Sequence, residues 1–173
     1  LITSSILARR GISEGSDILF YLENDQRFMH NPFLFDSMED AVDRIMDAVD
    51  EGEKVLIFGD RDVDGITSTI ILYEKLKELG LDVTFKVPTN DESYGLSKEN
   101  IDEFEKNGGT LIITVDCGIA NVEEVAYANE KSISVIVTDH HNPQETLPQN
   151  CIIINPKMEA CGYPFKDISG CAV

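Results

Sequence analysis

The sequence predicts an α/β fold with a parallel five-stranded sheet flanked by helices. From about residue 38 onward, short apolar segments alternate with segments whose apolar residues recur at helical spacing. The short segments are almost continuously apolar, as expected of strands that helices cover on both faces. Acidic or histidine-bearing loops follow three of them, and ligands of such sheets bind beyond the carboxyl ends of the strands.

The first regular helix is predicted to begin after Ser37, because apolar residues between Met38 and Val49 recur at helical spacing. Ser37 suits the N-cap position, with Asp40 three residues further on. Gly52 is expected to end this helix. The later elements are predicted in the order strand 55–58, helix 66–79, strand 83–87, helix 98–106, strand 111–115, helix 122–129, strand 135–138 and strand 152–154.

Two segments are expected along the chain. Residues 1–37 lack a regular pattern, and we expect an irregular or helical segment that packs on the core. Residues 38–173 are expected to form the main domain. With 173 residues, 42% of them hydrophobic, the chain can bury one sizeable core.

Composition excludes several classes of protein. A formal net charge of −18 argues against a domain that grips nucleic acid by its general surface, because that affinity comes from Lys and Arg on phosphates. No apolar run approaches the roughly 20 residues that span a bilayer, so no membrane association is expected. The start of the chain lacks the pattern of a secretory signal, and we expect a soluble, cytoplasmic protein. The four cysteines contain no C-x-x-C pair and are expected to be free thiols.

Three predicted strands end in metal-capable side chains. The triplet Asp139-His140-His141 follows one apolar strand, Asp116 follows another, and the stretch Gly59-Asp60-Arg61-Asp62-Val63-Asp64-Gly65 follows a third. A carboxylate and two imidazoles are costly to bury without partners. Because the carboxyl ends of parallel strands share one edge of the sheet, these three loops predict a metal cluster there.

The chemistry of the loops favours hard divalent cations. Asp60, Asp62 and Asp64 would point the same way on an extended backbone, and three converging carboxylates need a cation between them. Carboxylates mixed with imidazoles suit Mn²⁺ or Mg²⁺. Two such cations about 3.5–4 Å apart activate water in phosphoester hydrolysis. The following helix start, with the hydroxyls of Thr67 and Ser68, offers donors for a phosphate.

Three other interpretations of the acidic loop stay open at this point. A calcium loop of the EF-hand type would need a bidentate Glu at its twelfth position, where this chain has Ile71. A phosphatase of the haloacid dehalogenase type is partly matched by Asp62 to Thr67, but it leaves the histidines unexplained. A solvated acidic turn is disfavoured by the apolar strand and helix on either side.

The ordered set of motifs resembles the DHH phosphoesterase superfamily, and within it the RecJ-type single-stranded-DNA exonucleases. The motifs are Asn31-Pro32-Phe33-Leu34, Gly59 to Ser68, Ser93-Tyr94-Gly95-Leu96-Ser97, Thr114 to Ile119, Thr138 to His141 and Asn155-Pro156-Lys157. The resemblance implies the strand order 2-1-3-4-5. It also implies that the metal ligands are Asp62, Asp64, Asp116 and His140, with Asp60 close to them. His141 would contact the second metal or the scissile phosphate, and Asp139 would orient the histidines from behind.

The activity that the resemblance implies is Mn²⁺- or Mg²⁺-dependent hydrolysis of single-stranded DNA in the 5′-to-3′ direction, releasing 5′-mononucleotides in DNA repair or recombination. Single-strand-binding proteins or helicases are implied as partners by resemblance alone. The chain departs from the family at Phe58, where many members have His, and at Arg61, where an aromatic residue is common.

The end of the sequence marks a further departure. Residues 169–173 resemble the start of a further family helix, and the later family Asp and second domain lie beyond them. We therefore expect a DHH domain truncated at its C-terminal end, with weak or no activity alone. The alternatives are a phosphodiesterase or phosphatase acting on short oligonucleotides or cyclic dinucleotides, and a non-catalytic replication scaffold.

Overall fold

The computed structural model describes residues 2–23, 25, 27, 29–89 and 95–173. The chain forms two compact units, Leu1–Asn31 and Pro32–Val173. The first contains α1 (Ile2–Arg9) and α2 (Gly15–Leu22). The predicted boundary at residue 37, and the packing of the first segment on the core, stay predictions. Ser93 and Tyr94 of the predicted motifs lie outside the described residues.

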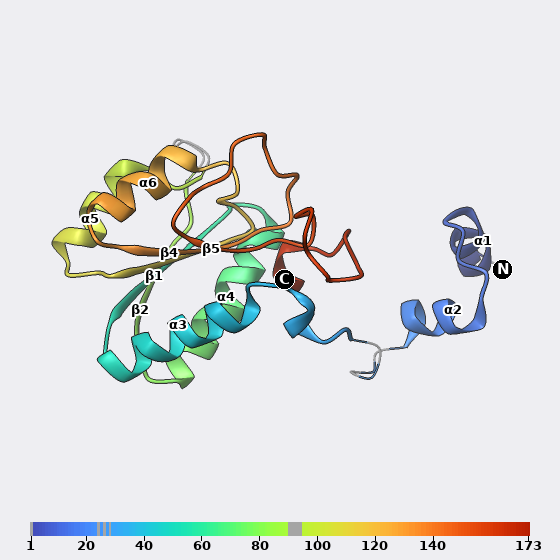
Figure 1. The fold of residues 1–173 in the computed structure, drawn as a ribbon. Helices are drawn as coiled ribbons and strands as arrows, with labels where there is room; N and C mark the ends of the chain where they lie inside the picture. Colours follow the sequence, from blue (N-terminus) through green and yellow to red (C-terminus); the bar gives the residue numbers. More distant parts are fainter. Residues whose placement is uncertain (1, 24, 26, 28, 90–94) are drawn as a thin grey trace. The chain divides into compact units, whose positions relative to one another are not determined.

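The second unit is built on a five-stranded parallel sheet with the order β2-β1-β3-β4-β5 (Figure 1). Its strands are β1 (Lys54–Gly59), β2 (Asp82–Lys86), β3 (Leu111–Val115), β4 (Ser134–Thr138) and β5 (Ile152–Ile154). The predicted fold class and strand order are confirmed.

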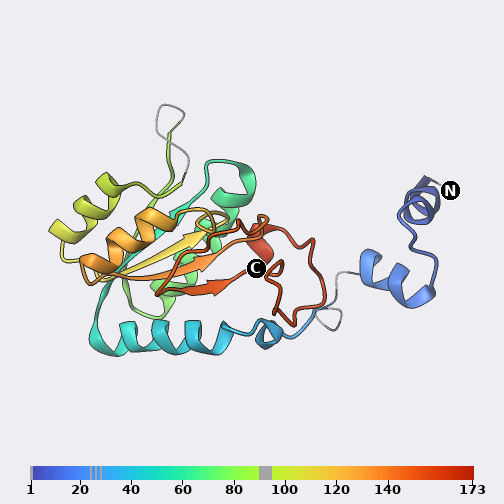
Figure 2. The same ribbon diagram turned by 45° about the horizontal axis from the view of Figure 1, so that its top comes forward.

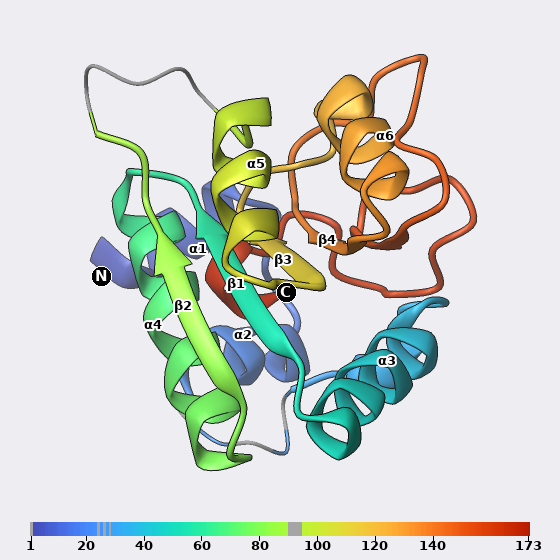
Figure 3. The same ribbon diagram turned by 90° about the vertical axis from the view of Figure 1, so that its left-hand side faces the viewer.

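Two pairs of helices cover the two faces of the sheet (Figures 2 and 3). Alternate side chains of β1 point to opposite faces, as the strand geometry requires. Val55 and Ile57 join the core formed with α3 (Met38–Glu51) and α4 (Val63–Glu78). Leu56 and Phe58 join the core formed with α5 (Lys98–Lys106) and α6 (Val122–Glu130). This double cover explains why the strands are apolar at nearly every position. No helix among the described residues is long and apolar enough to cross a bilayer.

Helix α3 begins and ends where the sequence predicts. Gly52 adopts the left-handed conformation, with φ of 66°, and its N–H reaches back to the last carbonyls of the helix. Ser37 occupies the N-cap position, but its side chain makes no capping hydrogen bond. The predicted N-cap position of Ser37 is therefore confirmed, although its side chain does not stabilise the helix end.

Helix α4 begins at Val63, three residues before the predicted start at Ile66. The reason is Asp62, whose carboxylate accepts hydrogen bonds from the backbone N–H groups of Asp64 and Gly65 and so caps the helix. Asp64 therefore lies in the first helical turn. The extended backbone expected through the acidic loop is absent from Val63 onward.

Two short 3-10 turns complete the second unit, η2 (Pro32–Leu34) and η3 (Gly170–Ala172). Contacts between η3 and α4 bring the C-terminal segment of the chain against the start of α4. This packing places residues near 170 beside the acidic loop.

Candidate metal centre

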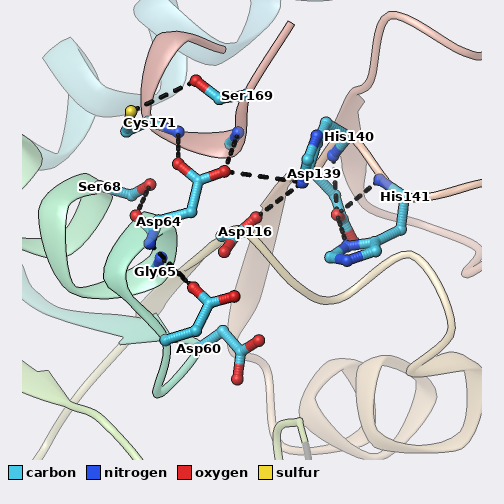
Figure 4. A network of polar contacts seen from close by, with 12 residues as sticks. Asp60, Asp64, Gly65, Ser68, Asp116, Asp139, His140, His141, Ser169 and Cys171 are labelled. Carbon is cyan, nitrogen blue, oxygen red and sulfur yellow. Dashed lines mark hydrogen bonds and ion pairs between the residues drawn. The ribbon is translucent and has the colours of Figure 1, made fainter. Parts of the chain in front are cut away.

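The carboxyl ends of three neighbouring strands bring the predicted site residues together. Gly59 of β1 pairs with Val115 of β3, and Val115 pairs with Thr138 of β4. An aspartate follows the last residue of each strand, so the three carboxylates lie at the same edge of the sheet and at the same position along the strands. Figure 4 shows the cluster that these residues form with the neighbouring helix and loops, centred on Asp60, Asp64, Asp116, Asp139, His140 and His141.

Asp116 lies at the centre of the cluster and is the most constrained of these residues. Its side chain is 1% exposed, and its backbone has φ of 59°, in the region that L-residues rarely adopt. Its Oδ1 is buried and accepts no hydrogen bond from the described residues. Burial, reinforced by the negative charges of Asp64 and Asp62, raises the pKa of Asp116 to about 7. A buried carboxylate oxygen without a donor is an anomaly that a bound cation resolves.

His140 faces this oxygen with its second ring nitrogen. The Nδ1 atom lies 2.9 Å from the carbonyl oxygen of Ile168, which can only accept, so Nδ1 carries the proton. In the neutral ring, Nε2 then presents its lone pair to Asp116 Oδ1, 3.1 Å away, and to Asp64 Oδ2, 3.7 Å away. Lone pairs that face one another across 3.1 Å repel unless a proton or a cation lies between them. The donor set therefore fits a metal ion.

Asp139 is a buried carboxylate whose acceptor capacity is largely used by its neighbours. Its Oδ1 accepts from the backbone N–H groups of His140 (2.7 Å) and His141 (3.0 Å) and from His141 Nδ1 (2.7 Å). Its Oδ2 accepts from the N–H of Ile119 at 3.0 Å. These bonds hold the ring of His141 with Nδ1 inward. Such a set is expected of a carboxylate that orients histidines. The family resemblance implies this role for Asp139, and it stays a prediction.

Two groups of side chains bring their oxygen or nitrogen atoms within 4.8 Å of one another. One group is Asp116, His140 and His141, and the other is Asp60, Asp62 and Asp116. Asp116 belongs to both. A shared carboxylate between two candidate cation positions is the arrangement of a two-metal site. The roles of the individual residues stay predictions.

Asp64 belongs to neither group. Its Oδ2 accepts from the N–H of Gly170 at 2.7 Å, and its Oδ1 accepts from the N–H of Cys171 at 2.8 Å. Burial alone would raise the pKa of Asp64, but the hydrogen bonds from Cys171 and Gly170 outweigh it and lower the pKa. Each carboxylate oxygen keeps a further lone pair, so Asp64 can still turn toward a cation. Its predicted role as a ligand stays a prediction.

Thr67 and Ser68 lie in α4 with their hydroxyls turned to the helix backbone. Thr67 donates to the carbonyl oxygen of Val63 (2.6 Å), and Ser68 donates to that of Asp64 (2.7 Å). Contact with a phosphate would require these bonds to be exchanged, so the substrate role of both residues stays a prediction.

Other residues at the site act through the backbone, and sequence patterns did not indicate them. Ile168, Gly170 and Cys171 contact His140 and Asp64 through main-chain atoms, which no side-chain motif can signal. Asn155 was noted only as part of a motif. Its buried side chain donates to the carbonyl oxygen of His141 at 3.0 Å and so fixes the loop that carries the histidines.

The parallel sheet and the carboxylate–imidazole cluster at its carboxyl edge define an α/β domain of the phosphoesterase type. Residues 54–173 match the family described as "DHH family, N-terminal domain". The chain belongs to the DHH family.

Comparisons with individual proteins agree with this assignment. The single-stranded-DNA-specific exonuclease RecJ of Bacillus subtilis (strain 168) is 38% identical over 173 residues, covering 99% of this chain and 22% of the relative. RecJ of Escherichia coli (strain K12) is 40% identical over 138 residues, covering 79% of this chain and 24% of the relative. The chain thus spans about a quarter of the length of these relatives.

Solved structures of RecJ share the fold. One described as exonuclease RecJ bound to manganese superimposes with a TM-score of 0.72 at 31% identity, covering 84% of this chain and 37% of that chain. RecJ in complex with Mn²⁺ from Thermus thermophilus gives a TM-score of 0.67 at 31% identity, covering 80% of this chain and 19% of that chain.

Proposed function

We propose that this chain carries the metal centre of a Mn²⁺- or Mg²⁺-dependent phosphodiesterase that degrades single-stranded DNA. The observation that carries the proposal is Asp116, a buried carboxylate that is shared by two groups of candidate ligands and has an oxygen to which no described residue donates. Relatives named as single-stranded-DNA-specific exonucleases, and RecJ structures that contain manganese, support it.

Asp116, His140 and His141 would hold one cation, and Asp60 and Asp62 would hold a second with Asp116 between them. Asp64 would join from the start of α4. Bound cations of this kind polarise a phosphate oxygen and make water a nucleophile near neutral pH. The imidazoles favour Mn²⁺ over Mg²⁺.

The remaining side chains hold the reacting groups in place. Asp139 keeps the Nδ1–H of His141 in a hydrogen bond, which leaves Nε2 free for the cation or the substrate. The neutral ring would bind the cation held by Asp116 and His140, whereas a protonated ring would instead donate from Nε2 to the oxygen that leaves the phosphorus. Asn155 fixes the backbone of the same histidine.

The substrate is proposed to be single-stranded DNA cleaved from its 5′ end to 5′-mononucleotides, in the cytoplasm. A net charge of −18 argues against a general basic surface that would bind phosphates over a long strand. The strand would therefore be held locally at the metals and by parts of the longer relatives that this chain does not match. Weak activity of the chain alone follows. Single-strand-binding proteins or helicases are proposed as partners by family membership. The relatives' names do not favour the other substrates or a scaffold.

Cleavage assays in Mn²⁺ test this proposal. Single-stranded DNA labelled at its 5′ end, a dinucleotide and a cyclic dinucleotide are compared as substrates of the wild-type protein, Asp116→Asn and Asp43→Asn. Asp43 is an exposed carboxylate on α3, so its variant makes the same chemical change away from the site. We expect slow release of mononucleotides from the DNA by wild type and Asp43→Asn, and no release by Asp116→Asn. Equal cleavage by Asp116→Asn, or cleavage of the cyclic dinucleotide alone, would refute the proposal.

A further inference from the structure

The segment Ile168–Cys171, here called the strap, lies against three of the predicted metal-binding residues. Its hydrogen bonds join residues that are far apart in the sequence. The bond with His140 spans 28 residues, and the bond between Gly170 and Asp64 spans 106 residues. We propose that the strap is a positioning element of the metal centre, and that residue 170 is glycine because Asp116 leaves no room for a side chain there. The part concerning the metal rests on the proposed function.

Three backbone groups of the strap fix two site residues. The carbonyl oxygen of Ile168 accepts from Nδ1 of His140 and so sets which ring nitrogen faces Asp116. The N–H groups of Gly170 and Cys171 each hold one oxygen of Asp64. The strap therefore orders an imidazole and a carboxylate before any cation arrives, and partners of this kind set the orientation of ligands.

Gly170 lies close to the third site residue, Asp116, and this approach is possible only because glycine has no side chain. A Cβ atom built on Gly170 would lie 2.2 Å from Oδ1 of Asp116, 2.7 Å from its Cγ and 2.8 Å from its Cβ. These atoms cannot move aside easily, since Asp116 is buried and its backbone is already in the left-handed region. The same oxygen is the one that receives no hydrogen bond from the described residues and faces His140. Gly170 thus closes one side of the centre at close range.

Backbone conformation does not account for this glycine. The φ angle of Gly170 is not positive, and the residue lies in a 3-10 turn that an alanine can adopt. The requirement for glycine therefore comes from the proximity of Asp116 and predicts a specific coupling between the two positions.

A double-mutant cycle tests the contact. Gly170→Ala is made in the wild type and in Asp116→Gly, where Cβ and the carboxylate are removed and the positive φ is retained without steric strain. Denaturation is followed in EDTA, so the result is independent of any metal. We expect Gly170→Ala to lower the midpoint in the wild type and to leave it unchanged or raised in Asp116→Gly. An equal loss in both backgrounds would overturn the proposed contact. If Gly170→Ala does not fold in the wild type, failure to fold in the Asp116→Gly background as well would also overturn it.

Titration with Mn²⁺ tests the positioning role. Gly170→Ala is expected to weaken Mn²⁺ binding by roughly 10-fold to 100-fold, as loss of a supporting partner does. Gly15→Ala is the matched control, because a Cβ there meets nothing within 4 Å and its φ is not positive. Unchanged Mn²⁺ affinity in folded Gly170→Ala would overturn the role of the strap. Absence of Mn²⁺ binding by the wild type would instead overturn the proposed function, and the cycle in EDTA would still decide the contact.

Discussion

Replacing Asp116 by Asn is predicted to stabilise the protein when no divalent cation is present. Burial and the charges of Asp64 and Asp62 raise the pKa of Asp116 from 3.8 to about 7, so above pH 7 the native state holds a carboxylate that is costly to ionise. At about 1.4 kcal/mol per pKa unit, the difference corresponds to a cost of about 4 kcal/mol. Asn has the same shape, cannot ionise, and tolerates the positive φ at this position.

The sign of the pH dependence follows from the same pKa. Between about pH 4 and pH 7 the folded wild type holds a proton on Asp116 that the unfolded chain has released. The contribution of this group to stability therefore falls as the pH rises through this range. The advantage of Asp116→Asn should be small near pH 4 and reach its limit, at most about 4 kcal/mol, above pH 7.

Chemical denaturation in EDTA measures this difference at roughly pH 4, 6 and 8, which lie near the lower limit of the titration, within it and above it. The expected result is a higher midpoint for Asp116→Asn than for wild type at the highest pH, with the gap closing at the lowest. A variant that is equally or less stable than wild type at the highest pH in EDTA would refute the reasoning that an ionised carboxylate without a hydrogen-bond donor is buried at the centre.

Three further predictions concern other charged groups. Asp139→Asn replaces one carboxylate oxygen by an NH₂ group, which would face N–H groups that need an acceptor. This variant is expected to weaken Mn²⁺ binding roughly 10-fold to 100-fold in calorimetric titration. Unchanged affinity would contradict the supporting role of Asp139. Arg44 forms a bidentate, half-buried pair with Glu53 and lowers the pKa of that carboxyl, so Arg44→Met should cost about 1–3 kcal/mol near neutral pH. That loss should shrink as the pH falls below the ordinary pKa of Glu53, and a loss that persists in acid would point to packing instead. Arg61, exposed beside the acidic loop, is expected to be dispensable for metal uptake: Arg61→Ala should bind Mn²⁺ like wild type, and loss of binding would show a structural role.

The sheet could be predicted because its signal is local. Continuous apolar segments and intervening helical spacing fix five strands and four helices within a few residues. Once the strands are parallel and adjacent, register alone brings Asp60, Asp116 and Asp139 to one edge, so the clustering of their loops was predictable without knowledge of side-chain contacts. The order of the strands came from the family resemblance.

Several details could not be predicted because they depend on competition between partners. Asp62 was expected to point with its neighbours, but its carboxylate bonds to free N–H groups of α4, and this advances the helix start by one turn. Ser37 had the residue type of an N-cap without making the bond. The partners of Asp64 are backbone groups 106 and 107 residues away, and main-chain contacts at that separation leave no pattern in the sequence.

The stoichiometry of Mn²⁺ binding tests the central claim most directly. Calorimetric titration compares the wild type with Asp116→Asn and the surface control Asp43→Asn. Because Asp116 belongs to both groups of candidate ligands, we predict two Mn²⁺ ions for the wild type and for Asp43→Asn, and loss of both sites in Asp116→Asn. Uptake by Asp116→Asn equal to that of the wild type, or no uptake by the wild type, would contradict the account.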